Sequence, residues 1–343
     1  MRLLLITQVV DRNDSVLGFM HGWIEKLAEH FEHISVICLK KGDFRLPNNV
    51  EVFSLGKEEG TSRVMRIIRF FRYIFVLRSS TDGVFVHMNP EYVVLGGMFW
   101  RLWEKRIVLW YNHGQRNLRL RLAMMLSNVV CYTSPYSASA GNAKSRQMPV
   151  GVDTKRFVYS HFSPRVHEGH REVLYLGRIA PVKRVDVIVE AVRRLLDAGV
   201  YMTLSVVGEA LLKDSAYMGS LRRMERTGIA FRGAESDRDK VIAVLNSNEF
   251  LINASPPGMY DKVVFEAMAC ECIPLVSSKA FEGILPPECF FKEGDSGDLA
   301  RVIQEMFSRP TGELESLCTL LRKRVTDEHS LERLVGMIAN LYV

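Results

Sequence analysis

Two cations lie close together in a loop that follows a predicted strand, and their chemistry suits phosphate. Arg178 and Lys183 fall within residues 177–183, directly after the apolar run 173–176. An arginine offers a planar fork of N–H donors and a lysine offers a point charge, so both can hold phosphate oxygens. A departing diphosphate needs fixed positive charge of this kind as its bond breaks. Taken alone, the segment can also be interpreted as a solvated loop.

A second segment supplies a carboxylate and the start of a helix. A loop with Pro256, Pro257 and Gly258 runs into a helix predicted to begin near Lys262. The N-terminus of a helix presents backbone N–H groups and a positive dipole, which favour a pyrophosphate. Glu266 lies about one turn into this helix, where its carboxylate could accept hydrogen bonds from both hydroxyls of a ribose. Its alternative role is to complement the helix dipole.

A histidine of the first half could act on the same ligand. His113 lies in residues 110–114, at the carboxyl end of a predicted strand. From that position it could bond a sugar hydroxyl or orient an acceptor. An ordinary loop histidine with satisfied hydrogen bonds is the alternative interpretation.

One motif has the spelling of a metal site but a different predicted role. Asp237-Arg238-Asp239 matches a metal-binding Asp-x-Asp pattern, yet it directly precedes an apolar helix at 241–245. Helix capping is the role that this position favours. We therefore expect no metal requirement.

The elements that must position these residues follow one rhythm in both halves of the chain. Short apolar runs alternate with amphipathic stretches, which indicates parallel sheets covered by helices on both faces. The predicted strands are residues 3–9, 34–39, 84–87, 107–110 and 129–132, then 173–176, 204–208, 250–253 and 273–276, and the clearest helices are 19–31 and the stretch with Ile188, Ala191, Val192, Leu195 and Leu196. Residues 142–172 interrupt the rhythm and are interpreted as the connection between domains.

The predicted fold class is therefore α/β, with two Rossmann-like domains that face each other across a cleft. Domain boundaries are placed at residues 1–150 and 151–328, followed by a C-terminal helix in 329–343. Ligands of such sheets bind at the carboxyl ends of the strands, which is where all three chemical segments fall.

Composition excludes several classes of protein. Hydrophobic residues make up 48% of the 343 residues, and no apolar run is long enough for a membrane span. The six cysteines show no metal-ligand spacing, so reduced thiols of a cytoplasmic protein are expected. Residues 1–150 hold 20 lysines and arginines against 12 aspartates and glutamates, a net charge of +8, whereas the remainder has −2. No recognisable nucleic-acid-binding module accompanies this basic half.

Taken together, these segments resemble the family 4 glycosyltransferases of GT-B fold. The matching pieces occur in the family's order, most clearly in the second half: residues 148–153 with Phe157, then 177–183, 206–209, 231–233 and 266–270. The resemblance implies that Arg178 and Lys183 hold the donor diphosphate, that Glu266 binds the donor ribose and that His113 lies near the donor sugar. It adds donor-binding positions at Gly208, Gly233, Lys262 and Val263, and places the loop after Gly233 by the nucleobase.

The chain departs from the family at three places. Many members carry a second glutamate eight positions before the ribose carboxylate, where this chain has Gly258; our hypothesis is that Asp261 or Lys262 makes that sugar contact. Glu271 replaces a usual glycine. The glycine-rich loop of the first domain is reduced to residues 14–19, so Asp14, Gly18 and Phe19 are the expected acceptor-side residues.

The resemblance implies a retaining transferase that moves a sugar from a UDP- or GDP-sugar to a glycan or lipid-linked acceptor. It implies no cofactor and no catalytic metal, and a C-terminal tail that can cross back to the first domain. A sugar-nucleotide epimerase, a sugar phosphorylase and a noncatalytic sugar-nucleotide-binding protein are the alternatives. Nucleotide release in the presence of an acceptor separates the transferase from all three.

A basic amphipathic stretch has two interpretations, and one of them includes a membrane as partner. Arg63, Arg66, Arg69 and Arg72 recur at every third residue among apolar side chains. One interpretation is a helix that lies on an anionic membrane, near a lipid-linked acceptor on its cytoplasmic face. The other is an ordinary surface helix of the first domain.

Overall fold

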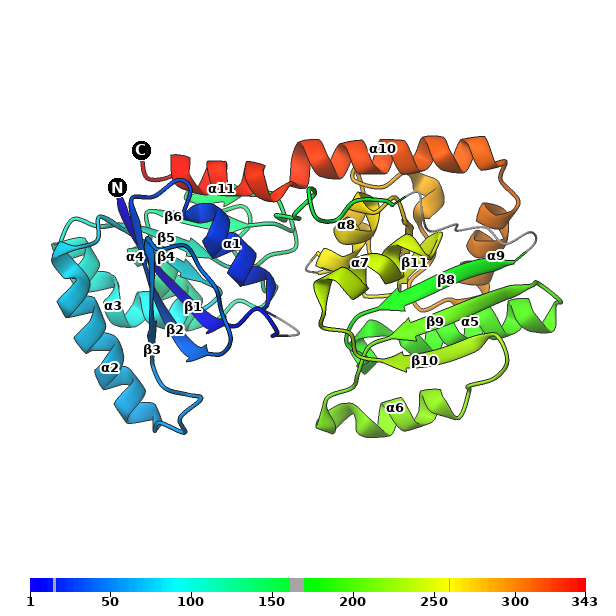
Figure 1. Cartoon of the computed structure of the whole chain (residues 1–343), viewed down its shortest axis with the longest axis horizontal. Coiled ribbons are helices and arrows are strands. Elements are labelled where there is room, and N and C mark those ends of the chain that lie inside the picture. Colours follow the sequence, from blue (N-terminus) through cyan, green and yellow to red (C-terminus); the bar gives the residue numbers. More distant parts are fainter. Residues whose placement is uncertain (15–16, 161–169, 259) are drawn as a thin grey trace. The chain divides into compact units, whose positions relative to one another are not determined.

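Two parallel sheets, each covered by helices, make up the computed structural model, which describes residues 1–14, 17–160, 170–258 and 260–343. The chain divides into unit 1, Met1–Gly151 with Leu331–Val343, and unit 2, Val152–Ser330. Each unit has the α/β architecture that the alternating pattern predicted (Figure 1). No helix among the described residues has the length and apolar character that crossing a bilayer requires.

The sheet of unit 1 has the strand order β3-β2-β1-β4-β5-β6-β7, and every pair of neighbours is parallel. Its strands are β1 (Arg2–Val10), β2 (His33–Lys41), β3 (Val50–Ser54), β4 (Gly83–His87), β5 (Arg106–Trp110), β6 (Val129–Tyr132) and β7 (Ser145–Gln147). Its helices are α1 (Phe19–Leu27), α2 (Arg63–Val76), η1 (Leu77–Ser79), α3 (Pro90–Leu102), α4 (Leu118–Leu126) and α11 (Leu331–Asn340).

Strand β1 shows why both faces of this sheet must be covered. Its side chains alternate between faces, and those on each face are buried. Leu3 and Leu5 belong to the core beneath α1 and α11, whereas Leu4 and Ile6 belong to the core beneath α2, α3 and α4. The segment Leu331–Val343 therefore completes one face of unit 1.

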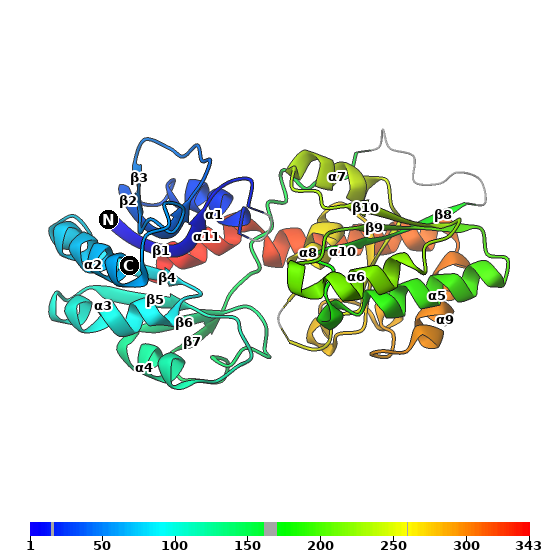
Figure 2. The same cartoon turned by 90° about the horizontal axis from the view of Figure 1, so that it is seen from below.

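The sheet of unit 2 has the order β10-β9-β8-β11-β12 and is also parallel. Its strands are β8 (Arg171–Leu176), β9 (Met202–Val207), β10 (Ile229–Gly233), β11 (Phe250–Asn253) and β12 (Ile273–Val276). Helices α5 (Val185–Asp197), α6 (Ser215–Arg222) and α9 (Ser296–Phe307) lie on one side of it, and α7 (Arg238–Asn246), α8 (Lys262–Ala269) and α10 (Thr311–His329) lie on the other (Figures 1 and 2). Short helices are η2 (Pro181–Lys183), η3 (Leu212–Asp214), η4 (Lys279–Phe281) and η5 (Pro287–Cys289).

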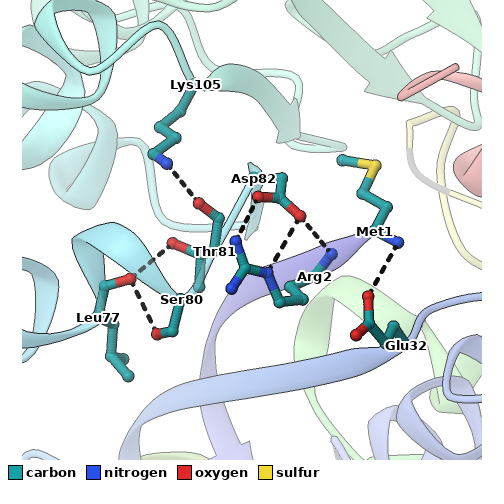
Figure 3. A network of polar contacts seen from close by, with 8 residues as sticks. All are labelled: Met1, Arg2, Glu32, Leu77, Ser80, Thr81, Asp82 and Lys105. Carbon is teal, nitrogen blue, oxygen red and sulfur yellow. Dashed lines mark hydrogen bonds and ion pairs between the residues drawn. The ribbon is translucent and has the colours of Figure 1, made fainter.

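Polar contacts fix the amino end of the first sheet, opposite the edge where ligands of such sheets bind. The guanidinium of Arg2 donates to both carboxylate oxygens of Asp82, at 3.3 and 2.9 Å, and the Arg2 amide donates to the same carboxylate at 2.8 Å. Lys105 donates to the carbonyl of Thr81, next to Asp82 (Figure 3). These contacts tie the starts of β1, β4 and β5 together and leave the carboxyl ends of the strands for function.

The structure corrects two predicted elements. The helix predicted over residues 19–31 ends at Leu27, because Glu29 and His30 continue as turns toward β2. The predicted connection over 142–172 contains β7, an edge strand paired with β6, so the irregular part is shorter. Residues 161–169 of that connection, Ser15 and Val16 of the reduced loop, and Met259 lie outside the described residues.

Candidate active site

The centre of the candidate site in unit 2 is an ion pair between the loop after β8 and the start of α8. The ammonium of Lys183, the last residue of η2, lies 2.5 Å from Oδ1 of Asp261 and donates to the Ser255 hydroxyl at 3.3 Å. Oδ2 of Asp261 accepts from Ser255 at 2.6 Å and from the Asn253 amide at 2.7 Å. The cluster thus joins the carboxyl ends of β8 and β11, as the topology of a parallel sheet predicts.

Asp261 stands at the N-cap position of α8, but its side chain makes no capping hydrogen bond. Its two oxygens are taken by Lys183, Ser255 and Asn253 instead. Burial alone would raise the pKa of Asp261, but the Lys183 ammonium and the hydrogen bonds from Ser255 and Asn253 hold it below its ordinary value of 3.8. Asp261 is therefore a fixed anion that orients the lysine. Whether it also contacts a donor sugar stays a prediction.

A second ion pair lies farther along α8. The Glu266 carboxylate is 8% exposed, and its Oε1 accepts from Nη1 of Arg238 at 2.9 Å. Arg238 opens α7 and lies over the Phe157 ring, at 5.8 Å from the ring centroid. Arg322 of α10 fixes that ring's segment, because it donates to the carbonyls of Phe157 and Thr154 at 2.9 and 3.1 Å.

Lys262, the first residue of α8, is subject to the same charges. Burial is the main cause that lowers the pKa of Lys262 to about 8; the Arg238 charge acts in the same direction, and the carboxylates of Glu266 and Asp153 oppose the shift. Val263 follows it in the first turn. A dianionic diphosphate placed at this helix start would favour the charged form of Lys262.

Glycines bring the backbone of three loops together at the carboxyl ends of β8, β9 and β10. The amide of Gly177 donates to Val207, and the amide of Gly208 donates to Gly233 at 2.7 Å. A Cβ atom on Gly208 would stand 1.9 Å from the Gly177 carbonyl oxygen. Only glycine therefore fits at position 208 without a shift of the backbone. Apart from its chain neighbours, no described heavy atom lies within 4 Å of a Cβ built on Gly233, and its place by a nucleobase stays a prediction.

Arg178 is not part of the ion-pair cluster. Its side chain is exposed, and its carbonyl accepts from the Tyr175 hydroxyl at 2.7 Å. No side-chain contact joins it to Lys183 among the residues that the structure describes. The loop therefore offers one cation that is already paired and one that is open to solvent.

In unit 1, the predicted residues lie at carboxyl ends of strands or directly after them. His113 is exposed in the loop after β5, with its ring 5.6 Å from that of Tyr111. Asp14 accepts from the Leu17 amide at 2.8 Å, and the Gly18 amide donates to the Asp14 carbonyl at 2.9 Å. Phe19 begins α1 and packs against Trp23 at a centroid distance of 5.4 Å.

Sequence reasoning missed several residues of these sites. His87, at the end of β4, is 2% exposed and its ring lies 6.0 Å from Phe19 and 5.8 Å from Trp23. Asn253 and Ser255 are polar residues at the carboxyl end of β11, and this position is the signal that could identify them. Arg238 was considered only within its Asp-x-Asp motif, where the expected capping by Asp237 is confirmed: its side chain accepts from the Asp239 amide at 2.9 Å.

Comparison with solved structures identifies the fold. The fold matches Anabaena HepE in complex with UDP, with a TM-score of 0.80 and 15% identity over 99% of both chains. It also matches sucrose-phosphate synthase from Thermosynechococcus elongatus, with a TM-score of 0.77 and 16% identity over 100% of this chain and 98% of that one. The chain has the GT-B fold of these proteins, with two Rossmann-like domains.

Sequence comparison then shows which family part of the chain resembles. Residues 170–309 match the model of the glycosyl transferases group 1 family. A GDP-mannose-dependent alpha-(1-6)-phosphatidylinositol dimannoside mannosyltransferase from Mycobacterium tuberculosis is 28% identical over 204 residues, which cover 55% of this chain. The match spans about half of that relative's length, 51%. Residues 170–309 are therefore similar to the glycosyl transferases group 1 family, and the chain has the fold of the solved GT-B structures.

Proposed function

We propose that this chain transfers a sugar from a UDP- or GDP-sugar to a glycan or lipid-linked acceptor, with retention of the anomeric configuration. The observation that carries the proposal is the pairing of Lys183 with Asp261 and of Arg238 with Glu266, at the carboxyl ends of the unit 2 strands. These residues lie inside the segment that matches the family model. The HepE structures contain UDP and UDP-glucose, and the mycobacterial relative uses GDP-mannose, so both nucleotides belong in the test.

In the proposed reaction, the acceptor hydroxyl attacks the anomeric carbon from the face that the diphosphate leaves. The bond from that carbon to the phosphate oxygen breaks, and the hydroxyl proton passes to the departing diphosphate. Lys183, Arg178 and the amides at the start of α8 stabilise the charge that builds on the diphosphate. Glu266 binds the ribose, and His113 holds the reacting sugar. Asp14, Gly18 and Phe19 belong to the acceptor side. No metal or other cofactor takes part, and we expect EDTA to leave the activity intact.

The decisive experiment is a thermal-shift panel of nucleotide sugars that includes GDP-mannose and UDP-glucose. A ligand that binds only the native state raises the apparent melting temperature by mass action. We expect one nucleotide class to raise it, and Arg178→Ala with Lys183→Ala to abolish the shift. Arg223→Ala with Lys213→Ala, at exposed positions of the same unit, is the matched control. A shift that survives loss of Arg178 and Lys183 would overturn their assignment.

Product analysis with the donor so identified separates the other activities. Release of free nucleotide that depends on an acceptor supports a transferase. Conversion of the donor without an acceptor would reveal an epimerase, and turnover without nucleotide would reveal a phosphorylase. Binding without turnover would leave a noncatalytic protein.

We also propose a peripheral contact between helix α2 and an anionic membrane on the cytoplasmic side. Ser62 caps α2, whose exposed side chains include Val64 at 68%, Ile68 at 53% and Val76 at 66%. Arg69 is paired with Glu59 at 3.0 Å, so the arginines do not form one uniformly open stripe. Arg63 and Arg72 are exposed, and neither has an ion-pair partner in the described part of the chain. An apolar surface flanked by open cations suits anionic lipid headgroups.

Sedimentation with liposomes tests this contact. We expect binding to vesicles that contain anionic lipid, loss at high salt, and a strong reduction in Val64→Ser with Ile68→Ser. Leu212→Ser, at a position 95% exposed in unit 2, is the matched control. Binding that ignores lipid charge and salt would exclude the electrostatic contact.

A further inference from the structure

A cavity of about 940 Å³ opens beside the second sheet. It is lined by Pro257 and Ser277, which follow β11 and β12, and by residues of η4, η5, α9 and α10. Neither Lys183 nor Glu266 is among its described lining residues. Its volume lies within the range of about 300–1,000 Å³ that is typical of small-molecule sites.

The walls of this cavity are apolar. Leu285 and Phe291 are buried at 4% exposure, and Phe290 lies beside them. At the mouth, Leu320 of α10 is 45% exposed. A ligand with an apolar body would remove this surface from water, which is favourable in proportion to the area covered.

Some of the charged side chains around the cavity have ion-pair or hydrogen-bond partners, and others do not. Arg301 is paired with Asp298 and Glu305, and Arg324 donates to the carbonyls of Gly283 and Ile284. The ammonium groups of Lys279 and Lys292 are exposed and have no carboxylate partner within 4.0 Å in the residues described. Glu282 and Glu293 are both exposed; Glu293 is paired with Arg184 at 2.8 Å, and Glu282 has no ion-pair partner in the residues described. The open charge is therefore positive.

The cavity is connected to the candidate active site through two short paths. Glu293 holds Arg184, the neighbour of Lys183 in the chain. Pro257 lies in the loop between Ser255 and Asp261, which both contact Lys183. Both lining segments therefore adjoin residues that carry or contact the Lys183–Asp261 pair.

We infer that this cavity binds an amphiphilic organic phosphate, with its apolar body against Leu285, Phe290 and Leu320 and its phosphate at Lys279 and Lys292. A lysine ammonium binds phosphate as a point charge and imposes little geometry on it. Occupancy would change donor affinity, and by linkage a bound donor would change the affinity of the cavity by the same factor.

Isothermal titration calorimetry of the full chain with 2-naphthyl phosphate tests this inference. We expect binding at least about tenfold tighter than that of inorganic phosphate, which lacks the apolar body, or of 2-naphthol, which lacks the charge, since tenfold corresponds to about 1.4 kcal/mol. Lys279→Ala with Lys292→Ala should weaken binding at least fivefold, and Leu320→Glu should do the same. Lys213→Ala with Lys240→Ala, and Leu212→Glu, should leave it unchanged.

Titrations repeated with saturating UDP and then GDP locate the probe. Binding of the probe that persists at saturating nucleotide, even at a changed affinity, supports a site in the cavity. Complete competition by either nucleotide would place the probe in the donor site and overturn the inference, as would equal binding to all variants. The titration of the free chain with 2-naphthyl phosphate does not depend on the proposed function. If the chain bound no nucleotide, the proposed function would fail, but the measured binding of the probe would still test the cavity.

Discussion

Arg238 and Glu266 form an ion pair of 2.9 Å between the first residue of α7 and the middle of α8, and the pair is largely withdrawn from water. A carboxylate that binds a ribose must keep a fixed orientation before the ligand arrives. Arg238 donates to Oε1 of Glu266, and Oε2 accepts no hydrogen bond from the described residues. We therefore propose that Arg238 positions the carboxylate that the family resemblance assigns to the donor.

Replacement of Arg238 should affect stability and donor binding together. Arg238→Ala leaves the Glu266 carboxylate without its partner, which should cost about 1–3 kcal/mol of unfolding free energy and raise the donor dissociation constant. Arg238→Lys should recover part of both losses, because it keeps the charge but not the planar fork. Urea unfolding and calorimetric titration measure the two effects, with Arg223→Ala as the control. An unchanged donor affinity in Arg238→Ala would remove Arg238 from the site.

Asp261 should make the free energy of unfolding fall more steeply as the pH is lowered into the acid range. Because the folded state lowers the pKa of Asp261 below 3.8, its stabilising effect is complete above that pH and is lost as the pH falls through the lower, folded value. Asp261→Asn should therefore be less stable than the parent chain at pH 7, and the difference should shrink below about pH 4. Thermal unfolding from pH 7 to pH 3 measures it, with Asp239→Asn as an exposed control. A difference that stays constant with pH would contradict the assignment.

Lys262 should destabilise the free protein at neutral pH. Its pKa falls from 10.5 to about 8 on folding, so between these values the unfolded chain binds more protons, and stability rises with pH. The free-energy cost of keeping Lys262 charged in the folded state is fully present below pH 8. Lys262→Met should therefore raise the free energy of unfolding at pH 7 and lose this advantage near pH 10.5. Lys240→Met, at an exposed lysine, should show no such dependence; a similar pH dependence in both variants would argue against the shift.

Gly208 should tolerate no side chain. Alanine at this position places Cβ 1.9 Å from the Gly177 carbonyl oxygen, so the loops after β8 and β9 must separate. We expect a loss of about 1–3 kcal/mol together with weaker donor binding. Gly312→Ala, where no atom lies within 4 Å of the added Cβ, should be neutral or slightly stabilising. Equal free energies of unfolding of the two variants in urea would show that the loops after β8 and β9 separate at little cost.

The sequence predicted the strands well because buried parallel strands are nearly continuous apolar runs. The strand predicted over 250–253 coincides with β11, and the helix predicted near Lys262 begins at that residue. The predicted strands omit β3, β7 and β10, which all lie at sheet edges. The three residues of β7 are polar and half-exposed, and they carry no periodic signal. For the site, the sequence pointed to Lys183, Asp261 and Glu266, but not to the pairing of Lys183 with Asp261 or of Glu266 with Arg238. Asp261 and Arg238 are 78 and 28 residues away along the chain, and only the topology brings them into contact.

The return of Leu331–Val343 to unit 1 also constrains how the chain acquires its structure. Leu334, Val335 and Ile338 fill the core beneath α1, yet they are synthesised only after all of unit 2. The first unit therefore cannot mature on the ribosome ahead of the second, although domains commonly fold in order of synthesis. A polypeptide released after residue 330 would expose that apolar face to chaperones and proteases.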